Sequence, residues 1–284
     1  MNYLGYIGMK PGDKIKGLHY YWVWFWSAAA SYSIIWAATG ALWIKTTKAK
    51  VCYKKWLGQD WVADYSRRNA STVISNHSTF VDSAVHCLYQ LPQFVSKAEV
   101  KKVPGLGMNM VYNDCLFIDR QSKESKKSIQ QQIVDRQINR SQVTGDPLII
   151  YPEGCTTNGS CLIEFKKGAF VSLQSIKPVL HLFNSWTQSN STGVLDGMQH
   201  YVLSACNPYS TLEVLDLPIF EPNDFFFKHH MKEGEEQWET YMRVIRQIMA
   251  EEGGLELSEQ SIEDKFKYRA LVFGEKNKDK TKSE

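Results

Sequence analysis

The chain has 284 residues, more than the ~100 to 200 residues of a usual single domain, so we expect one large domain with a short appendage. Hydrophobic residues make up 43% of the chain and charged residues 22%, a composition that excludes wholesale disorder and a coiled coil. The formal net charge of +3 is too weak to indicate nucleic acid as a partner. The six cysteines form no CxxC pair and no zinc-type spacing, which indicates free thiols in a reducing compartment.

The N-terminal region contains a long stretch without acidic or basic residues. Residues 18–44 lack Asp, Glu, Lys and Arg, and as a helix rising ~1.5 Å per residue they would exceed the ~30 Å hydrocarbon core of a bilayer. Aromatic residues crowd its first part, between Tyr20 and Trp26, where rings prefer the headgroup level. We expect a membrane-spanning helix, with a re-entrant or in-plane anchor and a buried core helix as alternatives. Residues 1–56 are therefore interpreted as a membrane anchor with lysine-rich flanks.

After residue 56, short apolar runs alternate with helical patterns, which is typical of an α/β fold. Strands are predicted at 71–75, 93–96, 115–118, 148–151, 176–183 and 212–219. Helices are predicted at 82–90, 123–144, 168–174 and around Trp238 to Met249, where apolar residues recur at helical spacing. We expect a mixed, largely parallel central sheet flanked by helices over residues 57–274, and a disordered charged tail at 275–284.

The first candidate site residues follow the strand predicted at 71–75. His77 and Asp82 are five residues apart, which places them ~140° apart on an ideal helix. They can meet only if His77 lies on the turn and Asp82 on the first helical turn, where the carboxylate would fix the imidazole tautomer. The alternative is a helix N-terminus capped by Ser78 or Thr79 beside a surface histidine, and the spacing alone leaves both interpretations open.

Three further segments carry candidate binding residues. Arg120 lies just past the strand predicted at 115–118 and suits a phosphate as a bidentate donor. The polar loop 151–159 follows a buried run, at the strand end where α/β folds bind ligands. Pro178 lies at the start of another apolar run. Taken singly, these segments are also compatible with a surface arginine, an ordinary turn and a strand-edge proline.

Taken together and in this order, the segments resemble the glycerolipid acyltransferase superfamily, the HxxxxD or PlsC-like proteins. The resemblance covers roughly residues 70 to 274 and is strongest to the branch of lysophosphatidylcholine and lysophosphatidylethanolamine acyltransferases. That branch pairs an EGTTTNG-like motif, here residues 153–159, with FKxGAF, here residues 165–170. The first of these is called the third motif below.

The resemblance implies a role for each candidate residue. His77 would deprotonate the acceptor hydroxyl and Asp82 would orient His77. The substrate would be bound by the remaining candidates, which are Arg120, Glu153, Gly154, Thr156, Thr157, Asn158, Gly159 and Pro178. The implied reaction is that of a 1-acylglycerophospholipid O-acyltransferase in phospholipid synthesis or remodelling, with acyl-coenzyme A as co-substrate, a membrane lysophospholipid as acceptor, and neither metal nor cofactor. The implied location is the endoplasmic reticulum membrane, with a mitochondrial membrane as the alternative.

Two departures from the pattern leave a second function open. Cys155 stands where the branch usually has Thr, and Asp114 and Cys115 stand where many members show a glycine. Cys155 could in principle form an acyl-enzyme, although the dyad would already activate the acceptor directly. The alternative function is an acyltransferase-like structural or lipid-binding subunit of a membrane protein complex, with weakened or lost activity. A soluble hydrolase is disfavoured because the sequence has no GxSxG elbow.

Overall fold

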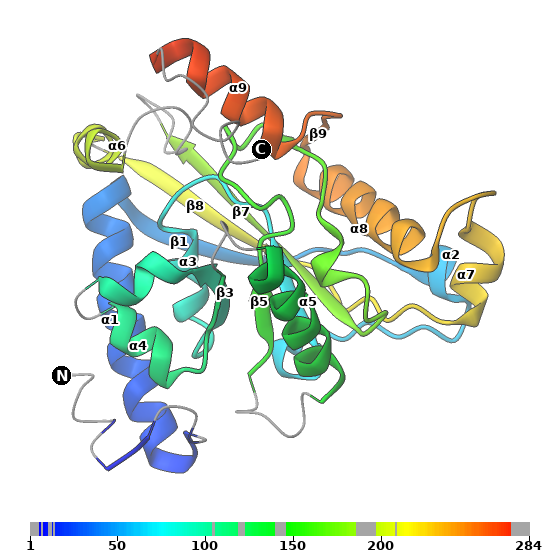
Figure 1. The fold of residues 1–284 in the computed structure, drawn as a ribbon, viewed down its shortest axis with the longest axis horizontal. Coiled ribbons are helices and arrows are strands. Elements are labelled where there is room, and N and C mark those ends of the chain that lie inside the picture. Colours follow the sequence, from blue (N-terminus) through cyan, green and yellow to red (C-terminus); the bar gives the residue numbers. More distant parts are fainter. Residues whose placement is uncertain are drawn as a thin grey trace.

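A central β-sheet covered by helices on both faces forms the body of the molecule (Figure 1). The computed structural model describes residues 6, 8–10, 13, 15–103, 106–118, 123–139, 146–185, 197–207 and 209–273. The predicted tail at 275–284 lies outside the described residues, as does Arg120.

The main sheet has the strand order β1-β8-β7-β2-β5-β3-β4. Its strands are β1 (Ala41–Lys48), β2 (Thr72–Ser75), β3 (Gln93–Lys97), β4 (Leu116–Ile118), β5 (Leu148–Ile150), β7 (Ile176–Ser185) and β8 (Ser210–Asp216). Neighbouring strands run parallel except β7 and β8, which are antiparallel. A separate parallel pair joins β6 (Cys161–Leu162) to β9 (Glu256–Leu257). The predicted mixed, largely parallel sheet is therefore confirmed.

Helices connect and cover these strands. They are α1 (Gly17–Thr39), α2 (Lys54–Leu57), α3 (Asp82–Cys87), α4 (Leu106–Tyr112), α5 (Lys123–Ile138), α6 (Gly197–Ala205), α7 (Asp224–His230), α8 (Gln237–Gly253) and α9 (Ile262–Phe273). Short 3-10 turns span Arg67–Asn69, Ala98–Lys102 and Lys167–Ala169.

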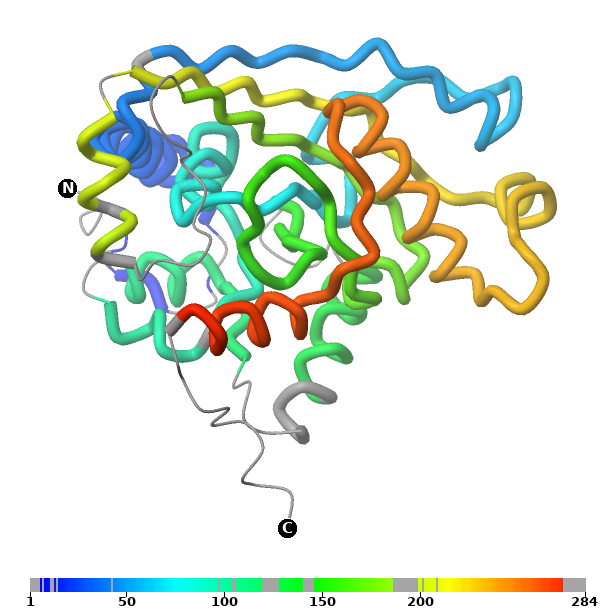
Figure 2. The backbone as a smooth tube through the Cα atoms, turned by 90° about the horizontal axis from the view of Figure 1, so that it is seen from above, coloured from blue at the N-terminus to red at the C-terminus, as the bar shows by residue number. Residues whose placement is uncertain are grey.

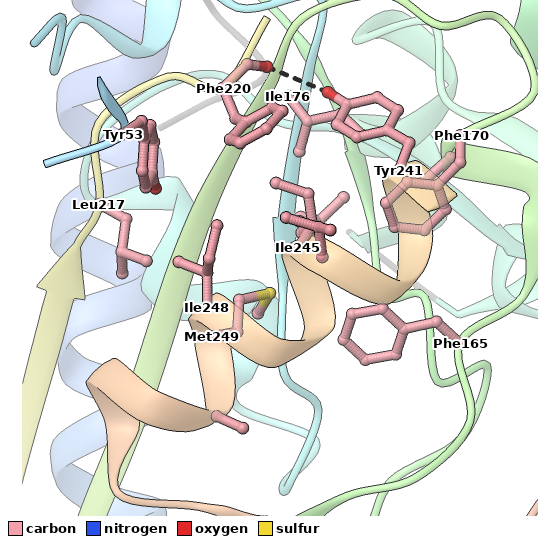
Figure 3. Close-up of a cluster of buried hydrophobic side chains, with 14 of the residues drawn as sticks. Tyr53, Phe165, Phe170, Ile176, Leu217, Phe220, Tyr241, Ile245, Ile248 and Met249 are labelled. Atoms are coloured by element: carbon pink, nitrogen blue, oxygen red, sulfur yellow. Dashed lines mark hydrogen bonds between the residues drawn. The ribbon is translucent and has the colours of Figure 1, made fainter. Parts of the chain in front are cut away.

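The two faces of the sheet carry different helices because successive strand residues point to opposite sides. Ile74 and Leu180 pack in one core cluster with α8, whereas their neighbours Val73 and Val179 pack in another cluster with α1 and α3. Figure 3 shows the first cluster, in which the hydroxyl of Tyr241 donates to the backbone oxygen of Phe220 at 3.0 Å. The apolar stripe predicted around residues 238–249 is thus core packing.

The apolar stretch predicted as one long helix is divided at Gly40. Helix α1 ends there because Gly40 has a left-handed φ of 67°, and a Cβ atom at this position would meet Asn207 O at 2.5 Å. The prediction of a helix up to residue 44 is therefore wrong, since residues 41–48 form β1 and pair with β8. Of the helices described, none is long and apolar enough to cross a membrane. The predicted membrane-spanning helix is accordingly not confirmed.

Helix α1 instead lies against the protein along one face. Its buried residues recur every three or four positions, and it packs on α3 and α6. They are Tyr20, Val23, Ser27, Ser31, Ile35, Ala38 and Thr39. The remaining surface exposes large apolar side chains, among them Trp22, Phe25 and Trp36. This helix is therefore anchored to the domain by one side and apolar on the other.

One other predicted element is wrong. The helix expected at 168–174 is reduced to the 3-10 turn Lys167–Ala169. Leu173 adopts a positive φ of 54°, a conformation that a right-handed helix does not contain, so the turn cannot continue. The predicted helix at 123–144 is confirmed as α5 as far as Ile138, and residues 140–144 of that prediction lie outside the described residues.

Candidate functional site

The imidazole of His77 and the carboxylate of Asp82 meet at the end of β2. His77 lies on the turn after this strand and Asp82 is the first residue of α3. The His77 Nδ1 and Asp82 Oδ2 atoms are 2.9 Å apart. Neither Ser78 nor Thr79 caps α3 with its side chain, because Val81 holds the N-cap position without a side-chain hydrogen bond. Of the two interpretations that the spacing left open, the structure has the dyad.

Asp82 fixes the turn as well as the imidazole. Its Oδ2 also accepts hydrogen bonds from the backbone N–H groups of Ser78 at 2.8 Å and Thr79 at 2.9 Å. The Asp82 side chain is fully buried, whereas the His77 side chain keeps 21% of its surface exposed. With Nδ1–H donating to the carboxylate, Nε2 is the basic nitrogen of His77. A buried carboxylate thus orients an imidazole that solvent can reach.

Asp82 stays ionised in this environment. Burial alone would raise its pKa, but the neighbouring imidazoles of His181 and His77 outweigh burial and lower the pKa to about 2. An ionised carboxylate can compensate the positive charge that His77 acquires when it takes up a proton.

Tyr151, directly after β5, packs against one face of the His77 imidazole. Its ring stacks on the His77 imidazole with centroids 4.1 Å apart and planes 18° from parallel. His77 is therefore held at Nδ1 by Asp82 and on one ring face by Tyr151, which restricts the imidazole to one orientation.

Glu153, predicted to bind substrate, is instead part of the support beneath His77. Its side chain is buried, and its Oε1 and Oε2 atoms accept from the backbone N–H groups of His77 at 2.9 Å and Ile163 at 3.4 Å. Burial raises its pKa to about 8, against the effect of these two backbone donors. The placement indicates that Glu153 positions the His77 turn.

The rest of the third motif packs on the same turn. Thr157 N donates to His77 O at 2.7 Å. Gly159 has a φ of +79°, and a Cβ atom there would lie 3.3 Å from the Cβ atom of Ser78. Asn158 Oδ1 accepts from Ser160 N at 3.1 Å and so shapes its own turn. The structure therefore brings the third motif against the turn that holds His77.

Two other residues of the third motif contact lysine side chains: Thr156 contacts Lys265 of α9, and Gly154 lies next to Lys166. Lys265 Nζ of α9 donates to the Thr156 backbone oxygen at 2.5 Å and to its hydroxyl at 2.8 Å, which ties α9 to the loop (Figure 2). Gly154 has a φ of +71°, and a Cβ atom there would lie 3.0 Å from the Lys166 side chain. Helix α9 and Lys166 thus border the third motif.

Pro178 lies away from the dyad. It is a buried residue of β7 in register with Ile74, three positions before His181. An odd separation along a strand places two side chains on opposite faces, so the ring of Pro178 points away from the face that carries His181. This placement favours a packing role over the predicted contact with substrate.

The sequence analysis missed His181, whose Nδ1 lies 3.4 Å from Asp82 Oδ1. Nearby, Lys177 Nζ lies 3.1 Å from Asp216 Oδ2 and donates to Leu217 O at 2.6 Å. Burial lowers the pKa of Lys177 to about 8, an effect that Asp216 opposes. Lys177 and His181 share one face of a strand that was predicted to be apolar, and this pattern is the signal that could have revealed them.

Within the described residues, no group of three or more His, Cys, Asp and Glu side chains is arranged to hold a metal ion. The chemistry that the described site offers is proton transfer at His77 Nε2.

The chain is similar in sequence to known acyltransferases. Residues 63–181 match the family described as Acyltransferase, a range that includes every predicted site residue. The chain is 28% identical over 235 residues to the lysophospholipid acyltransferase LPEAT1 of Arabidopsis thaliana, covering 81% of this chain and 55% of that protein. It is 28% identical over 198 residues to lysophosphatidylcholine acyltransferase 2 of Homo sapiens, covering 68% of this chain and 34% of that protein. The chain therefore spans about half of the first relative and about a third of the second.

A solved structure has a similar fold. The crystal structure of the 1-acyl-sn-glycerophosphate acyltransferase PlsC from Thermotoga maritima matches with a TM-score of 0.50, covering 84% of this chain and 83% of that chain. The two sequences are 17% identical, so this likeness shows the fold alone.

Proposed function

From the match of residues 63–181 to the acyltransferase family, we propose that the chain transfers an acyl group from acyl-coenzyme A to the free hydroxyl of a lysophospholipid. The observation that carries the proposal is the 2.9 Å contact between His77 Nδ1 and Asp82 Oδ2, with Asp82 buried and His77 partly exposed. This arrangement supplies a general base with a fixed tautomer, which such a transfer uses to activate the acceptor hydroxyl.

In the proposed reaction, His77 Nε2 takes the proton of the acceptor hydroxyl as its oxygen attacks the thioester carbonyl carbon. The new C–O ester bond forms and the C–S bond breaks, so the coenzyme leaves as a thiolate. The proton held by His77 then passes to the sulfur, and the imidazole returns to its neutral form. Asp82 remains ionised throughout and stabilises the transient imidazolium.

The acceptor would bind beside the third motif. The loop from Gly154 to Gly159 contacts the His77 turn, so a ligand on this loop would lie close to the base. Arg120, outside the described residues, keeps its proposed role as the ligand of the acceptor phosphate. No cofactor enters the proposed reaction.

We further propose that the protein works at a membrane surface with α1 lying in the plane of the interface. One face of α1 is buried in the domain, while Trp22, Phe25 and Trp36 are 44%, 57% and 53% exposed on the rest of it. Tryptophan and other aromatic side chains favour the headgroup level of a bilayer. This is the in-plane alternative that the sequence left open, and the endoplasmic reticulum is the proposed membrane.

The decisive experiment is an assay of the purified protein with labelled acyl-coenzyme A and a panel of lysophospholipids. We expect transfer by the wild type and a loss of ~10² to 10⁴-fold in the His77→Ala variant, because general-base assistance is typically of this size. His229→Ala is the matched control, since His229 is an exposed histidine that contacts the Phe225 backbone. Wild-type turnover by His77→Ala contradicts the mechanism.

The same assay addresses the alternative of a subunit without activity. The intact dyad favours the enzyme. A native preparation that yields a stable membrane complex and no acyl transfer with any lysophospholipid would instead support the alternative.

A further inference from the structure

The second oxygen of Asp82 faces a histidine that no step of the proposed reaction uses. Oδ2 serves His77 and the two backbone N–H groups, so it has no capacity left for another partner. Oδ1 lies 3.4 Å from Nδ1 of His181, and neither oxygen of Asp82 has solvent exposure. The His181 side chain is itself completely buried.

We propose that His181 is a positioning residue for the acyl transfer: it partners Asp82 Oδ1 and thereby fixes the carboxylate that orients His77. This inference rests on the proposed function, because positioning has meaning only for a working dyad. His181 does not reach the reacting atoms and acts through Asp82.

A buried carboxylate oxygen needs a donor, since burial without a partner costs ~1 to 3 kcal/mol or more for a charged group. Within the described residues, Asp82 Oδ1 has no hydrogen bond of ordinary geometry, and His181 Nδ1 is the group placed to become its donor. A small closing movement, from 3.4 Å to the usual ~2.9 Å, would complete the bond when substrate fills the site.

A neutral imidazole suits this position better than a cation. Burial lowers the pKa of His181, an effect that Asp82 opposes and that Arg67 and His77 reinforce. A neutral His181 can donate one N–H to Asp82 without cancelling the carboxylate charge. That charge then remains available to stabilise the imidazolium of His77 during proton transfer.

The backbone of His181 is tied to the residue before His77. Asn76 Nδ2 donates to His181 O at 3.0 Å, and His181 N donates to Asn76 Oδ1 at 2.8 Å. This two-bond link fixes β7 relative to the catalytic turn. The two hydrogen bonds between Asn76 and His181 therefore fix the position of His181 relative to His77, the two histidines that flank Asp82.

His86 borders His181 but does not contact Asp82. The two rings lie 4.7 Å apart, while the nitrogens of His86 contact Ser75 Oγ at 3.0 Å and Arg67 Nη1 at 3.4 Å. His86 is thus a buried histidine of the same cluster with different partners. It serves as a matched control.

The test compares His181→Leu, His181→Asn and His181→Gln in the full-length protein. The amide nitrogen of Asn stands as many bonds from Cα as Nδ1 does, whereas the amide of Gln reaches one bond further. We expect His181→Leu to lower kcat by ~10 to 100-fold with little change in KM for the lysophospholipid, because a displaced catalytic group costs about this much. Asn should restore most of the lost kcat and Gln much less, while His86→Leu should lower kcat less than His181→Leu.

A double-mutant comparison separates positioning from general destabilisation. In the Asp82→Asn background, His181→Leu should cause little further loss of kcat, because its effect passes through the carboxylate. Wild-type kcat in His181→Leu, equal rescue by Asn and Gln, or an undiminished loss in the Asp82→Asn background would each overturn the inference. Inactivity of the folded wild type would instead overturn the proposed function, so the two failures are distinguishable. Circular dichroism of each variant verifies folding.

Discussion

Glu153 and His77 are joined by a hydrogen bond in which Oε1 of the Glu153 carboxyl group accepts from the backbone N–H of His77 at 2.9 Å. Because Glu153 is buried, this bond holds the His77 turn in place while the Glu153 side chain stays out of solvent. Glu153 of the third motif therefore supports His77 through the main chain. A ligand bound to residues 154–159 would therefore lie beside the residues that hold His77 in place.

Replacing Glu153 by Gln should change how stability depends on pH. Burial raises the Glu153 pKa from its ordinary 4.5 to about 8, so the folded protein holds this proton more tightly than the unfolded chain does. The resulting stabilisation is complete below the unfolded pKa and is lost as pH rises through the folded pKa. The free energy of unfolding of the wild type, relative to Glu153→Gln, should fall between about pH 5 and about pH 9. Urea denaturation at both values measures it, and a difference that does not vary with pH contradicts the expectation.

Replacing Gly159 by Ala should disturb the catalytic turn beyond the strain at the glycine itself. A positive φ costs a non-glycine residue ~1 to 2 kcal/mol wherever it occurs. Gly234 has a similar φ of +81° with nothing within 4 Å of an added Cβ, whereas at Gly159 the added atom meets Ser78 at 3.3 Å. Both alanine variants should lower the unfolding midpoint, but only Gly159→Ala should also lower kcat. Equal kcat values for the two variants would count against the contact with Ser78.

The dyad could be predicted from sequence because its members are close in the chain. His77 lies on the turn that joins β2 to α3 and Asp82 is the first residue of α3, so local geometry decides whether they meet. His181 and Tyr151 reach the same place from β7 and from the end of β5. Their positions depend on which strands lie beside β2, and the strand order arises from long-range pairing that no local pattern contains.

The structure of the N-terminal stretch, residues 18–44, could not be predicted from its local sequence. A run without charged residues is compatible with a membrane-spanning helix, a helix in a protein core and a β-strand. The end of α1 is decided by Gly40, which turns the chain so that residues from Ala41 pair with β8 about 170 residues later. Gly40 and Thr39 are visible in the sequence as weak helix formers. The partner strand that makes the break favourable is not.

Cys155 should be dispensable, because the dyad can activate the acceptor hydroxyl directly. Cys155→Ser is expected to keep turnover near that of the wild type, and Cys161→Ser, in the adjacent strand β6, is the matched control. Mass spectrometry of protein incubated with acyl-coenzyme A and no acceptor should reveal no thioester on Cys155. A loss of turnover as large as that of His77→Ala, together with an acyl adduct on Cys155, would favour an acyl-enzyme route.

The exposed side of α1 should determine membrane binding without affecting chemistry. Changing Trp22, Phe25 and Trp36 together to Ser removes apolar surface at ~25 cal/mol per Å², which should weaken sedimentation with phospholipid vesicles by at least about ten-fold. The buried side of α1 keeps its contacts with α3 and α6, so the unfolding midpoint should change little. Val62→Ser is the control, since Val62 is 82% exposed outside α1. Turnover on a water-soluble, short-chain lysophospholipid should remain near that of the wild type, because His77 and Asp82 lie on β2 and α3 rather than on α1. Unchanged vesicle binding by the triple variant would contradict the in-plane arrangement.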